Sequence, residues 1–564
     1  MWILGIAGGH NSAAALIRDG KVVVAVQTER LTRIKRHPIE LASMADETVR
    51  VIEYCVRAAG IDLPDIDAIA TCSPIGTTAR FVFEDAAAPA LGLPPFVSVP
   101  HHLAHAEYAL HYAPVARSLV LVCDGSGTFE HQRAELDLQE LAAGPVRHVS
   151  PGGKESISAY TYDGRDVRLV HRIAHGPAPR PPVGDVFDTP YGEVLVSLGH
   201  LWQWAAHYCH GSLHEAGKVM GLAPFGDPTV HRDLRTVRMS SDGDLAIDFA
   251  ALYRRFERPN LAACDVTGIT HYEDLAAHVQ EVTNDFLAGL VGLLLARHPA
   301  DRVTYSGGVA LNGIANEHLV RTLGVDLHMN GSCEDNGTAI GAAVAVHHAM
   351  TGTRTAEPVN DDYGRTYGTG EIEAAIARAS CRAELLPAGQ VPDATAVALA
   401  SGAIVGWFQG RSEFGPRALG NRSILADPRD PRMQRVLNEK VKRRERFRPF
   451  APAVLEDRAS EWFELEGPSP MMLRVVPVRS DRLPATTHID GSARVQTVNR
   501  EQNPRFHELL TAFDQRTGTP VLLNTSFNVA GEPIVESPDD ALRSFRAGGI
   551  DLLVLGDHLL RASR

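Results

Sequence analysis

The chain has 564 residues, more than one hydrophobic core usually serves, so we expect at least two domains. Its formal net charge of -13 argues against a protein whose main task is binding nucleic acid, because phosphate backbones attract a surplus of Lys and Arg. The seven cysteines include no C-x-x-C pair, which is typical of a reducing cytoplasm. The first residues do not read as a signal peptide, and the longest apolar run, 286–296, is too short to cross a membrane. We therefore expect a cytoplasmic protein without a nucleic-acid or membrane partner.

The first predicted elements are strands that lead into glycine-rich turns. Two β-branched runs, 2–7 and 21–26, flank a small-residue segment and a turn, which predicts a hairpin at the start of the chain. A further apolar strand at 118–123 runs into DGSG, and another at 303–306 runs into GGVALN. Several such turns over one large α/β region favour an actin-like (ASKHA) architecture, in which two related lobes clasp a nucleotide.

The glycine turns are candidate phosphate contacts of that first domain. Backbone N–H groups in such turns approach phosphates closely, although the same sequences also form plain tight turns. The candidate nucleotide-binding residues are Gly125, Gly127, Gly307, Gly308 and Asn312.

A change of composition marks the domain boundary. Around 351–366 the alanine-rich helical pattern gives way to polar and turn residues, so we expect one domain over 1–355 and a second over 365–564. The proline-rich run GPAPRPPVG at 176–184 predicts a surface loop, because proline interrupts both helices and central strands.

The segment HHLAHA at 101–106 is the most informative feature of the chain. His101 and His105 lie four residues apart at the start of a predicted helix, so their side chains project from one face about 5 to 6 Å apart. A lone pair of this kind is more often two buried, hydrogen-bonded histidines than a metal site. Asp124 and Asp335, each in a glycine-flanked turn, are candidate further ligands, although each could instead cap a turn or a helix. Two imidazoles and two carboxylates suit Fe(II), Zn or Mn.

The second half of the chain predicts a binding site for small anions. The glycine-rich segment 410–423 carries three arginines, and 440–448 holds six basic residues within nine. The guanidinium group of arginine binds phosphate or carboxylate through two hydrogen bonds. A basic run is by default a solvated helix face or a nucleic-acid patch, but the acidic overall charge and the interleaved aromatic residues favour a loop that lines a pocket. A polar cluster at 524–528 follows a strand and could also be an ordinary turn.

Taken together, the ordered motifs resemble the O-carbamoyltransferase family, which includes nodulation-factor, cephalosporin, ansamycin and aminoglycoside carbamoyltransferases. The resemblance extends over nearly the whole chain. Its N-terminal motifs are GGHNSAAALIRDG, TERLTRIKRH, HHLAHA, CDGSG, GKVMGLAPFG, SGGVALN and EDNGTAIGAA. Its C-terminal motifs are WFQGRSEFGPRALGNRSILADPRDP, KVKRRERFRPFAPAV, HIDGSARVQTV, NPRFHELL, PVLLNTSFNVAGEPIV and LVLGD.

The resemblance implies a particular pair of domains and a two-step reaction. The larger N-terminal domain would be similar to the metal-dependent, actin-like domain of the tRNA threonylcarbamoyladenosine machinery. The smaller C-terminal α/β domain would be similar to that system's YrdC-like partner. The C-terminal domain would make carbamoyl-adenylate from carbamoyl phosphate and ATP, supplied as Mg-ATP. The N-terminal domain would then transfer the carbamoyl group to a hydroxyl of a small natural product, such as an antibiotic or its sugar.

The resemblance also implies roles for individual residues. The metal, expected to be Fe(II), would be held by His101, His105, Asp124 and Asp335. His10 matches a histidine proposed to deprotonate the acceptor hydroxyl, and Lys218 would reach the adenylate phosphates. Carbamoyl phosphate and ATP would be bound by Arg417, Lys442, Arg444, Arg448, Arg494, Ser526 and Asn528. This chain has Asn11 where many relatives have aspartate, and Arg446 where a proline is common.

Three other functions remain as alternatives. An actin-like kinase or ATPase acting on a small molecule would explain the glycine turns, but neither the histidine pair nor the arginine-rich half. A tRNA-modifying threonylcarbamoyl transferase conflicts with the acidic charge. A catalytically inactive nucleotide-binding regulator would not need the full set of ligands. The acceptor is expected to be selected by 71–95 and 130–192, which carry no motif, and an oligomer is compatible with the sequence.

Overall fold

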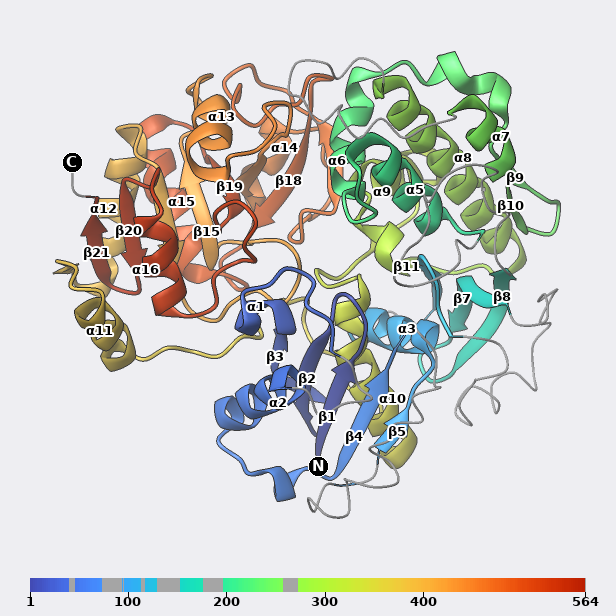
Figure 1. Ribbon diagram of the computed structural model, residues 1–564, viewed down its shortest axis with the longest axis horizontal. Helices are drawn as coiled ribbons and strands as arrows, with labels where there is room; N and C mark the ends of the chain where they lie inside the picture. Colours follow the sequence, from blue (N-terminus) through green and yellow to red (C-terminus); the bar gives the residue numbers. More distant parts are fainter. Residues whose placement is uncertain are drawn as a thin grey trace. The chain divides into compact units, whose positions relative to one another are not determined.

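The computed structural model describes most of the chain, namely residues 1–39, 46–73, 94, 96–112, 117–128, 153–175, 196–256 and 272–562. The proline-rich run at 176–184 and most of the two predicted acceptor segments lie outside these residues. The chain forms two compact units. The first consists of Met1–Ala25 with Pro38–Pro358, and the second of Val26–His37 with Val359–Arg564. Both units mix helices with sheets, which confirms the predicted α/β class (Figure 1).

The first sheet of the first unit has five strands in the order β3-β2-β1-β4-β5. The strands are β1 (Trp2–Ala7), β2 (Ala13–Arg18), β3 (Lys21–Gln27), β4 (Ala68–Cys72) and β5 (Phe96–Ser98). The predicted opening hairpin was incomplete, because the small-residue segment is itself the strand β2, paired antiparallel with β1. Its alanines are fully buried, because small side chains let helix α10 (Thr338–Thr351) pack on this strand.

The second sheet repeats the arrangement of the first. Its order is β12-β11-β6-β7-β8, formed by β6 (Ser118–Cys123), β7 (Lys154–Tyr162), β8 (Val167–His175), β11 (Arg302–Ser306) and β12 (Leu327–His328). In each sheet the first strand lies between an antiparallel neighbour that follows it directly and a parallel neighbour from later in the chain. This duplicated topology agrees with the predicted two-lobed, actin-like domain.

Helices α3 (His101–His111) and α10 pack against each other at very short range. Every residue of α3 is buried. A Cβ atom added to Gly341 of α10 would lie 1.8 Å from the carbonyl oxygen of Ala104 in α3, so the two helix backbones touch at this glycine. A Cβ added to Gly5 would lie equally close, 1.8 Å, to the carbonyl oxygen of Ala339, so α10 also touches strand β1. These contacts determine where the start of α3 lies relative to the start of α10.

The remaining elements of the first unit lie mostly between β8 and β12. They are α2 (Asp46–Ala59), α5 (Leu198–His210), α6 (Ala216–Leu222), β9 (Val237–Met239), β10 (Leu245–Ile247), α7 (Phe249–Arg255), α8 (Glu273–Arg297) and α9 (Gly313–Leu323). Among the described helices, α8 alone is long and apolar enough to cross a membrane, with a mean hydropathy of 1.2 in its most apolar window. Half of that window is buried, and α8 packs against α5, α6 and α9, as the core helix of a folded domain does.

The second unit is built around a nine-stranded sheet in the order β13-β21-β20-β14-β15-β19-β16-β18-β17. Its strands are β13 (Glu384–Leu385), β14 (Val405–Phe408), β15 (Arg422–Ala426), β16 (Ala451–Leu455), β17 (Arg474–Pro477), β18 (Ser492–Val498), β19 (Val521–Ser526), β20 (Leu552–Leu555) and β21 (His558–Arg561). Its helices are α1 (Thr28–Thr32), α11 (Thr369–Arg378), α12 (Val391–Ala400), α13 (Met433–Val436), α14 (Ala459–Trp462), α15 (Pro504–Thr517) and α16 (Pro538–Arg546).

Hydrophobic cores cover both faces of this sheet. Trp407 of β14 packs in a core with residues of α12 and α15, whereas its neighbour Phe408 packs in a separate core with residues of α11 and α16. Successive side chains of a strand point to opposite faces, so one strand supplies both cores. The strand ends and the loops between them lie outside these cores and can therefore carry polar groups.

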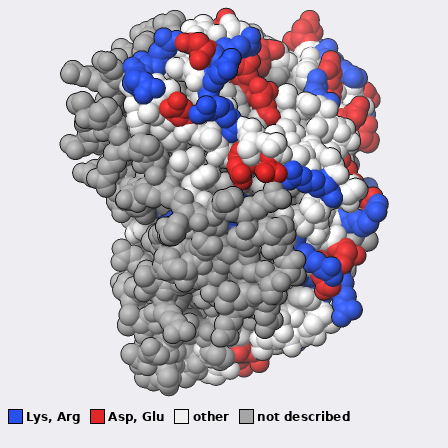
Figure 2. Space-filling model, turned by 90° about the vertical axis from the view of Figure 1, so that its right-hand side faces the viewer, with Lys and Arg blue, Asp and Glu red and all other residues white. Residues whose placement is uncertain are grey.

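Charged side chains are intermixed on the face drawn in Figure 2. Within the described residues of that view, Lys and Arg alternate with Asp and Glu over short distances. Nucleic-acid-binding proteins instead tend to cluster basic residues on one face.

We expect Gly341→Ala to destabilise the first unit, because the added methyl group meets the backbone of α3 and neither helix can yield locally. The free energy of unfolding should fall by at least about 2 kcal/mol, the usual scale of overpacking. Thermal unfolding followed by circular dichroism measures the change.

Gly292→Ala in α8 is the matched control. The only neighbour within 4 Å of a Cβ at Gly292 is a methyl group of Leu323 at 3.6 Å, an ordinary contact. Alanine is the better helix former by about 0.5 to 1 kcal/mol, so this variant should be as stable as the parent or more stable. Equal losses in both variants would contradict the proposed helix contact.

Candidate functional site

The histidine pair of α3 forms the centre of a buried polar cluster. Helix α3 begins at His101, directly after Pro100, so His101 and His105 lie in its first two turns, as expected. Their Nε2 atoms are 3.2 Å apart and their rings meet edge to face at 88°. Both side chains are fully buried. Two imidazolium groups at this separation would repel each other strongly, so at least one ring is neutral.

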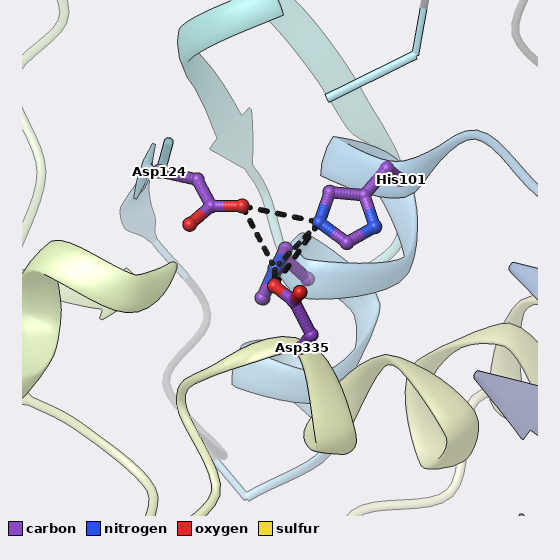
Figure 3. Close-up of side chains that lie close together, drawn as sticks. His101, Asp124 and Asp335 are labelled. Atoms are coloured by element: carbon purple, nitrogen blue, oxygen red, sulfur yellow. Dashed lines mark hydrogen bonds and ion pairs between the residues drawn. The ribbon is translucent and has the colours of Figure 1, made fainter. Parts of the chain in front are cut away.

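Two carboxylates complete the cluster from other elements (Figure 3). Asp124 follows β6 and Asp335 lies in the turn before α10, and in the view both point toward His101. Asp124 Oδ2 is 3.1 Å from His101 Nε2, and Asp335 Oδ1 is 3.5 Å from the same atom. Their distances to His105 Nε2 are 3.9 and 3.8 Å. One donor atom from each of the four residues lies within 4.8 Å of the others, a spacing that fits a single metal ion.

Neither carboxylate merely caps a helix or turn. Asp335 makes no capping hydrogen bond to α10, whose N-cap residue is Gly337. Asp124 does hold a turn, since its Oδ1 accepts a hydrogen bond of 3.0 Å from the N–H of Gly308, but its other oxygen faces the histidines. Helix capping therefore does not explain the position of Asp335, and holding a turn explains the contact of only one of the two carboxylate oxygens of Asp124.

The cluster is electrostatically suited to a cation. Burial alone would raise the pKa of Asp335, but the neighbouring histidines, first through a hydrogen bond from His101, outweigh it and hold the pKa well below its usual range. Burial lowers the pKa of His105, against the opposing effect of Asp335. Although burial would lower the pKa of His101, the charge of Cys72 and hydrogen bonds to Asp124 and Asp335 raise it well above its usual range. A bound divalent metal would replace that proton, since a histidine ligand must be neutral.

Each histidine ring is oriented by a partner that sequence analysis did not identify. His101 Nδ1 lies 3.3 Å from Cys72 Sγ, at the end of β4. His105 Nδ1 lies 3.1 Å from Ser306 Oγ at the end of β11, and that hydroxyl in turn donates to the carbonyl of Cys333 at 3.2 Å. Since the hydroxyl proton is used there, His105 donates from Nδ1 and keeps a lone pair on Nε2, inside the cluster. The only sequence signal was that both partners end buried strands.

His10 lies beside this cluster on the loop after β1. Its Nδ1 is 3.5 Å from Asp335 Oδ2, and its ring stacks on His214 with centroids 5.7 Å apart. The side chain of His10 is 30% exposed, so a substrate can reach it. Asn11 turns away and donates to Glu334 at 3.1 Å. Although Asn11 replaces an aspartate of many relatives, Asp335 supplies a carboxylate next to His10.

The glycine turns lie around the same cluster. The N–H of Gly308 binds Asp124, and Gly307 has a φ of 97° and packs against the backbone of Cys123, where a Cβ would lie 2.2 Å from the carbonyl oxygen. The carbonyl of Gly125 accepts a hydrogen bond from Ser197, and Gly127 packs against His102. These turns shape the strand ends that carry the ligands.

The other two residues predicted in this domain have partners within the fold. The side chain of Asn312 caps α9 by accepting from the N–H of Ala315 at 3.1 Å, and it also donates to Gln280 at 3.1 Å. Lys218 lies in α6, where its Nζ is 3.4 Å from Glu215. No described contact joins Lys218 or Asn312 to the histidine pair. Their predicted contacts with a nucleotide remain predictions.

In the second unit, Lys442 is the centre of a buried polar site. It ends a short π-helix (Leu437–Lys442) and is 5% exposed. Its Nζ donates to Asn528 Oδ1 at 2.7 Å and to Ser526 Oγ at 3.2 Å, and also to the backbone carbonyls of both residues. The structure thus brings together three of the predicted anion ligands from two distant segments.

Two of the predicted arginines, Arg444 and Arg448, lie near enough to Lys442 to repel its charge. Burial lowers the pKa of Lys442 well below its usual range, and the charges of Arg444, Lys35 and Arg448 lower it further. Burial and Arg448 lower the pKa of Arg444 to about 9. Burial, followed by the charges of Arg417, Arg444 and Arg448, lowers the pKa of Arg494. A buried lysine and half-buried arginines that repel one another form a site that a polyanion would stabilise.

Sequence analysis missed Lys35 as a member of this group, although it lies in the basic motif TERLTRIKRH. It also missed Glu413, which is 1% exposed and shapes the loop that carries Arg417. Glu413 Oε1 accepts hydrogen bonds from the N–H groups of Leu419 at 2.6 Å and Asn421 at 2.8 Å. A lone glutamate in a glycine-rich loop was the only available signal.

Comparison with known proteins assigns both halves of the chain to one family. The family model described as carbamoyltransferase N-terminus matches residues 2–82 and 78–344, and the one described as carbamoyltransferase C-terminus matches 396–562. Nodulation protein NolNO of Sinorhizobium fredii is 35% identical over 98% of this chain and 79% of its own length. The 3'-hydroxymethylcephem-O-carbamoyltransferase of Amycolatopsis lactamdurans is 29% identical over 99% of this chain and 98% of its own.

Among solved structures, full-length HypF in its phosphate- and nucleotide-bound form is 14% identical, with a TM-score of 0.41 over 63% of this chain and 56% of HypF. The sequence matches carry the assignment. With family models matching both halves, and a relative 35% identical over 98% of this chain, this chain belongs to the carbamoyltransferase family of transferases.

Proposed function

We propose that this enzyme makes carbamoyl-adenylate from carbamoyl phosphate and ATP and transfers the carbamoyl group to a hydroxyl of a small natural product. The observation that carries the proposal is the buried Lys442 ammonium group, held by Ser526 and Asn528, with Arg444 and Arg448 near enough to lower its pKa. Carbamoyl phosphate and the triphosphate of ATP are the polyanions that such a site would stabilise. The hydroxymethylcephem acceptor in the name of a relative supports transfer to oxygen and a role in antibiotic biosynthesis.

The first reaction belongs to the second unit. Carbamoyl phosphate, ATP and water give carbamoyl-adenylate, inorganic phosphate and pyrophosphate. Lys442, Arg444, Arg448 and Arg494 bind the phosphates, and the negative charge of the ligands raises the lowered pKa of Lys442 and so favours its ammonium form. Ser526 and Asn528 hold the Lys442 ammonium group in place, and Arg417 is the remaining cation of the site.

The second reaction belongs to the first unit. His101, His105, Asp124 and Asp335 would hold a divalent metal, either Fe(II) or Zn or Mn. Such an ion, when bound, supplies Lewis acidity toward phosphate or carbonyl oxygens. His10 takes the proton of the acceptor hydroxyl, and the resulting imidazolium is stabilised by Asp335. The hydroxyl oxygen bonds to the carbamoyl carbon while the bond from that carbon to the AMP phosphate oxygen breaks, which releases AMP.

We expect pyrophosphate release from ATP that depends on carbamoyl phosphate, and we expect Arg448→Ala to reduce its rate at least about 100-fold, the usual scale for losing a charged transition-state contact. Coupled detection of pyrophosphate, with nucleotide products resolved by chromatography, measures both. Formation of ADP instead would favour a kinase or ATPase.

Arg446→Ala is the matched control for that variant. Arg446 lies in the same basic run, but its side chain is 66% exposed and its guanidinium pairs with Glu439 at 2.7 Å. The variant should keep the parental rate within about threefold, because an exposed ion pair contributes little. A comparable loss in both variants would mean that the run acts through its overall charge rather than through a pocket.

We expect the purified chain to bind one divalent metal ion per molecule at the four-residue cluster. His105→Gln and Asp335→Asn should each lower the affinity for Co(II), a spectroscopic probe, at least about tenfold, since each removes a ligand. The visible absorption of bound Co(II) reports the binding directly and does not depend on activity.

His111→Gln controls for the loss of a buried histidine from the same helix. His111 lies at the opposite end of α3, where its Nε2 is 2.9 Å from Glu357. This variant should keep the Co(II) affinity even if its unfolding temperature falls. Unchanged Co(II) binding in His105→Gln would argue against the cluster as the metal site.

A further inference from the structure

One short segment of the chain belongs to a different unit from its neighbours. Val26–His37 has residues of the first unit on both sides in the sequence, yet by its contacts it is part of the second unit. It contains the last residues of β3, the helix α1 and the basic residues after it. Thr28 and Arg30 are almost completely buried. We call Val26–His37 the strap.

The strap binds the loop that carries Arg417. Arg30 is 2% exposed, and its Nη2 donates to the carbonyl of Gly415 at 2.8 Å. Its Nε donates to Gln27 of the strap at 3.0 Å, so the guanidinium group is held from its own segment. The N–H of Gly415 donates to Asp361 at 2.9 Å. Gly415 is therefore bonded on both sides two residues before Arg417.

The strap also binds the turn beyond Asn528. Arg33 donates from Nη1 to the carbonyl of Ile534 and from Nη2 to that of Pro533, both at 2.7 Å. That turn is bonded directly to the anion site, because Asn528 Nδ2 donates to the carbonyl of Glu532 at 2.6 Å. Asn528 Oδ1 is in turn an acceptor for Lys442.

The two arginines of the strap therefore hold two loops that contribute to the same anion site. Arg30 acts on the side of Arg417, and Arg33 acts on the side of Asn528 and Lys442. A guanidinium group that donates to two carbonyls fixes both distance and direction, which a single hydrogen bond does not. The cations of the site repel one another, so their loops would separate without such restraint.

We propose that Arg30 and Arg33 are positioning residues for the anion site. The strap completes this site, because residues 359–564 by themselves lack the hydrogen bonds from the strap that hold the two loops. This rests on the proposed function only for the identity of the anion. The arginines touch backbone carbonyls of the two loops, and they act through Arg417, Asn528 and Lys442.

The test is pyrophosphate binding to the full chain, measured by isothermal titration calorimetry. Arg33→Ala removes both carbonyl contacts and should weaken pyrophosphate binding at least about tenfold. Losing hydrogen bonds from a charged group lowers affinity by that factor or more. Arg33→Lys can reach one carbonyl but not both, so its affinity for pyrophosphate should lie between those of the parent and Arg33→Ala. In steady state, the KM for carbamoyl phosphate and ATP should rise more than kcat falls, because the variant disturbs the arrangement of the ligands rather than a reacting group.

Arg36→Ala is the matched control. Arg36 carries the same charge on the same strap, is exposed, and has a φ of 54°, close to the 62° of Arg33, so alanine imposes similar backbone strain at both positions. It should bind pyrophosphate within about twofold of the parent, as expected for an exposed charge.

The outcomes separate the strap from the anion site itself. Equal affinities in Arg33→Ala and Arg36→Ala would overturn the role of the strap while leaving the proposed function intact. A parent chain that does not bind pyrophosphate would overturn both. If Arg33→Ala does not fold, Arg33→Lys decides alone, and parental affinity in that variant would contradict the proposal.

Discussion

The contact between the backbones of α3 and α10 is the constraint on which the first site depends. Gly341 lets the carbonyl of Ala104 approach to a distance that any side chain would prevent. The same α10 touches β1 above Gly5, so the helix is fixed against both a strand and another helix. His101 and His105 are carried by one of these helices, and Asp335 lies just before the other. The distance between imidazoles and carboxylate therefore follows from packing of the backbone, which is less variable than packing of side chains.

The two sites use buried charge of opposite sign. In the first unit two carboxylates and two imidazoles converge, and a neutral ring next to ionised acids attracts a cation. In the second unit lysine and arginine side chains converge, and the carboxylate of Glu445, 3.8 Å from Arg448, offsets only part of their charge. Burying charge without a partner is unfavourable, so a cation at the first cluster and an anion at the second would each stabilise the fold.

Positioning groups are as important as ligands at both sites. Cys72 and Ser306 orient the imidazole rings from the ends of two different strands, so the lone pair of His105 faces inward. In the second unit Glu413 holds backbone N–H groups of the loop around Arg417, and the strap binds the carbonyls of the same region. These groups neither bind the substrate nor react, yet they decide whether the ligands meet at the required distance.

Sequence alone determined the features that depend on local spacing or on composition. The i, i+4 separation of His101 and His105 fixes their common face through helix geometry, and the composition of the basic run at 440–448 predicts an anion site. The same local reasoning failed for β2, whose small residues were taken for a connection, because only packing against α10 makes alanine a good strand residue there. Tertiary structure alone decided that Asp335 faces the histidines instead of capping α10, that Cys72 and Ser306 lie behind them, and that the strap belongs to the second unit. Each of these joins residues far apart in the chain, and such contacts depend on how the whole chain buries its apolar surface, which no local pattern encodes.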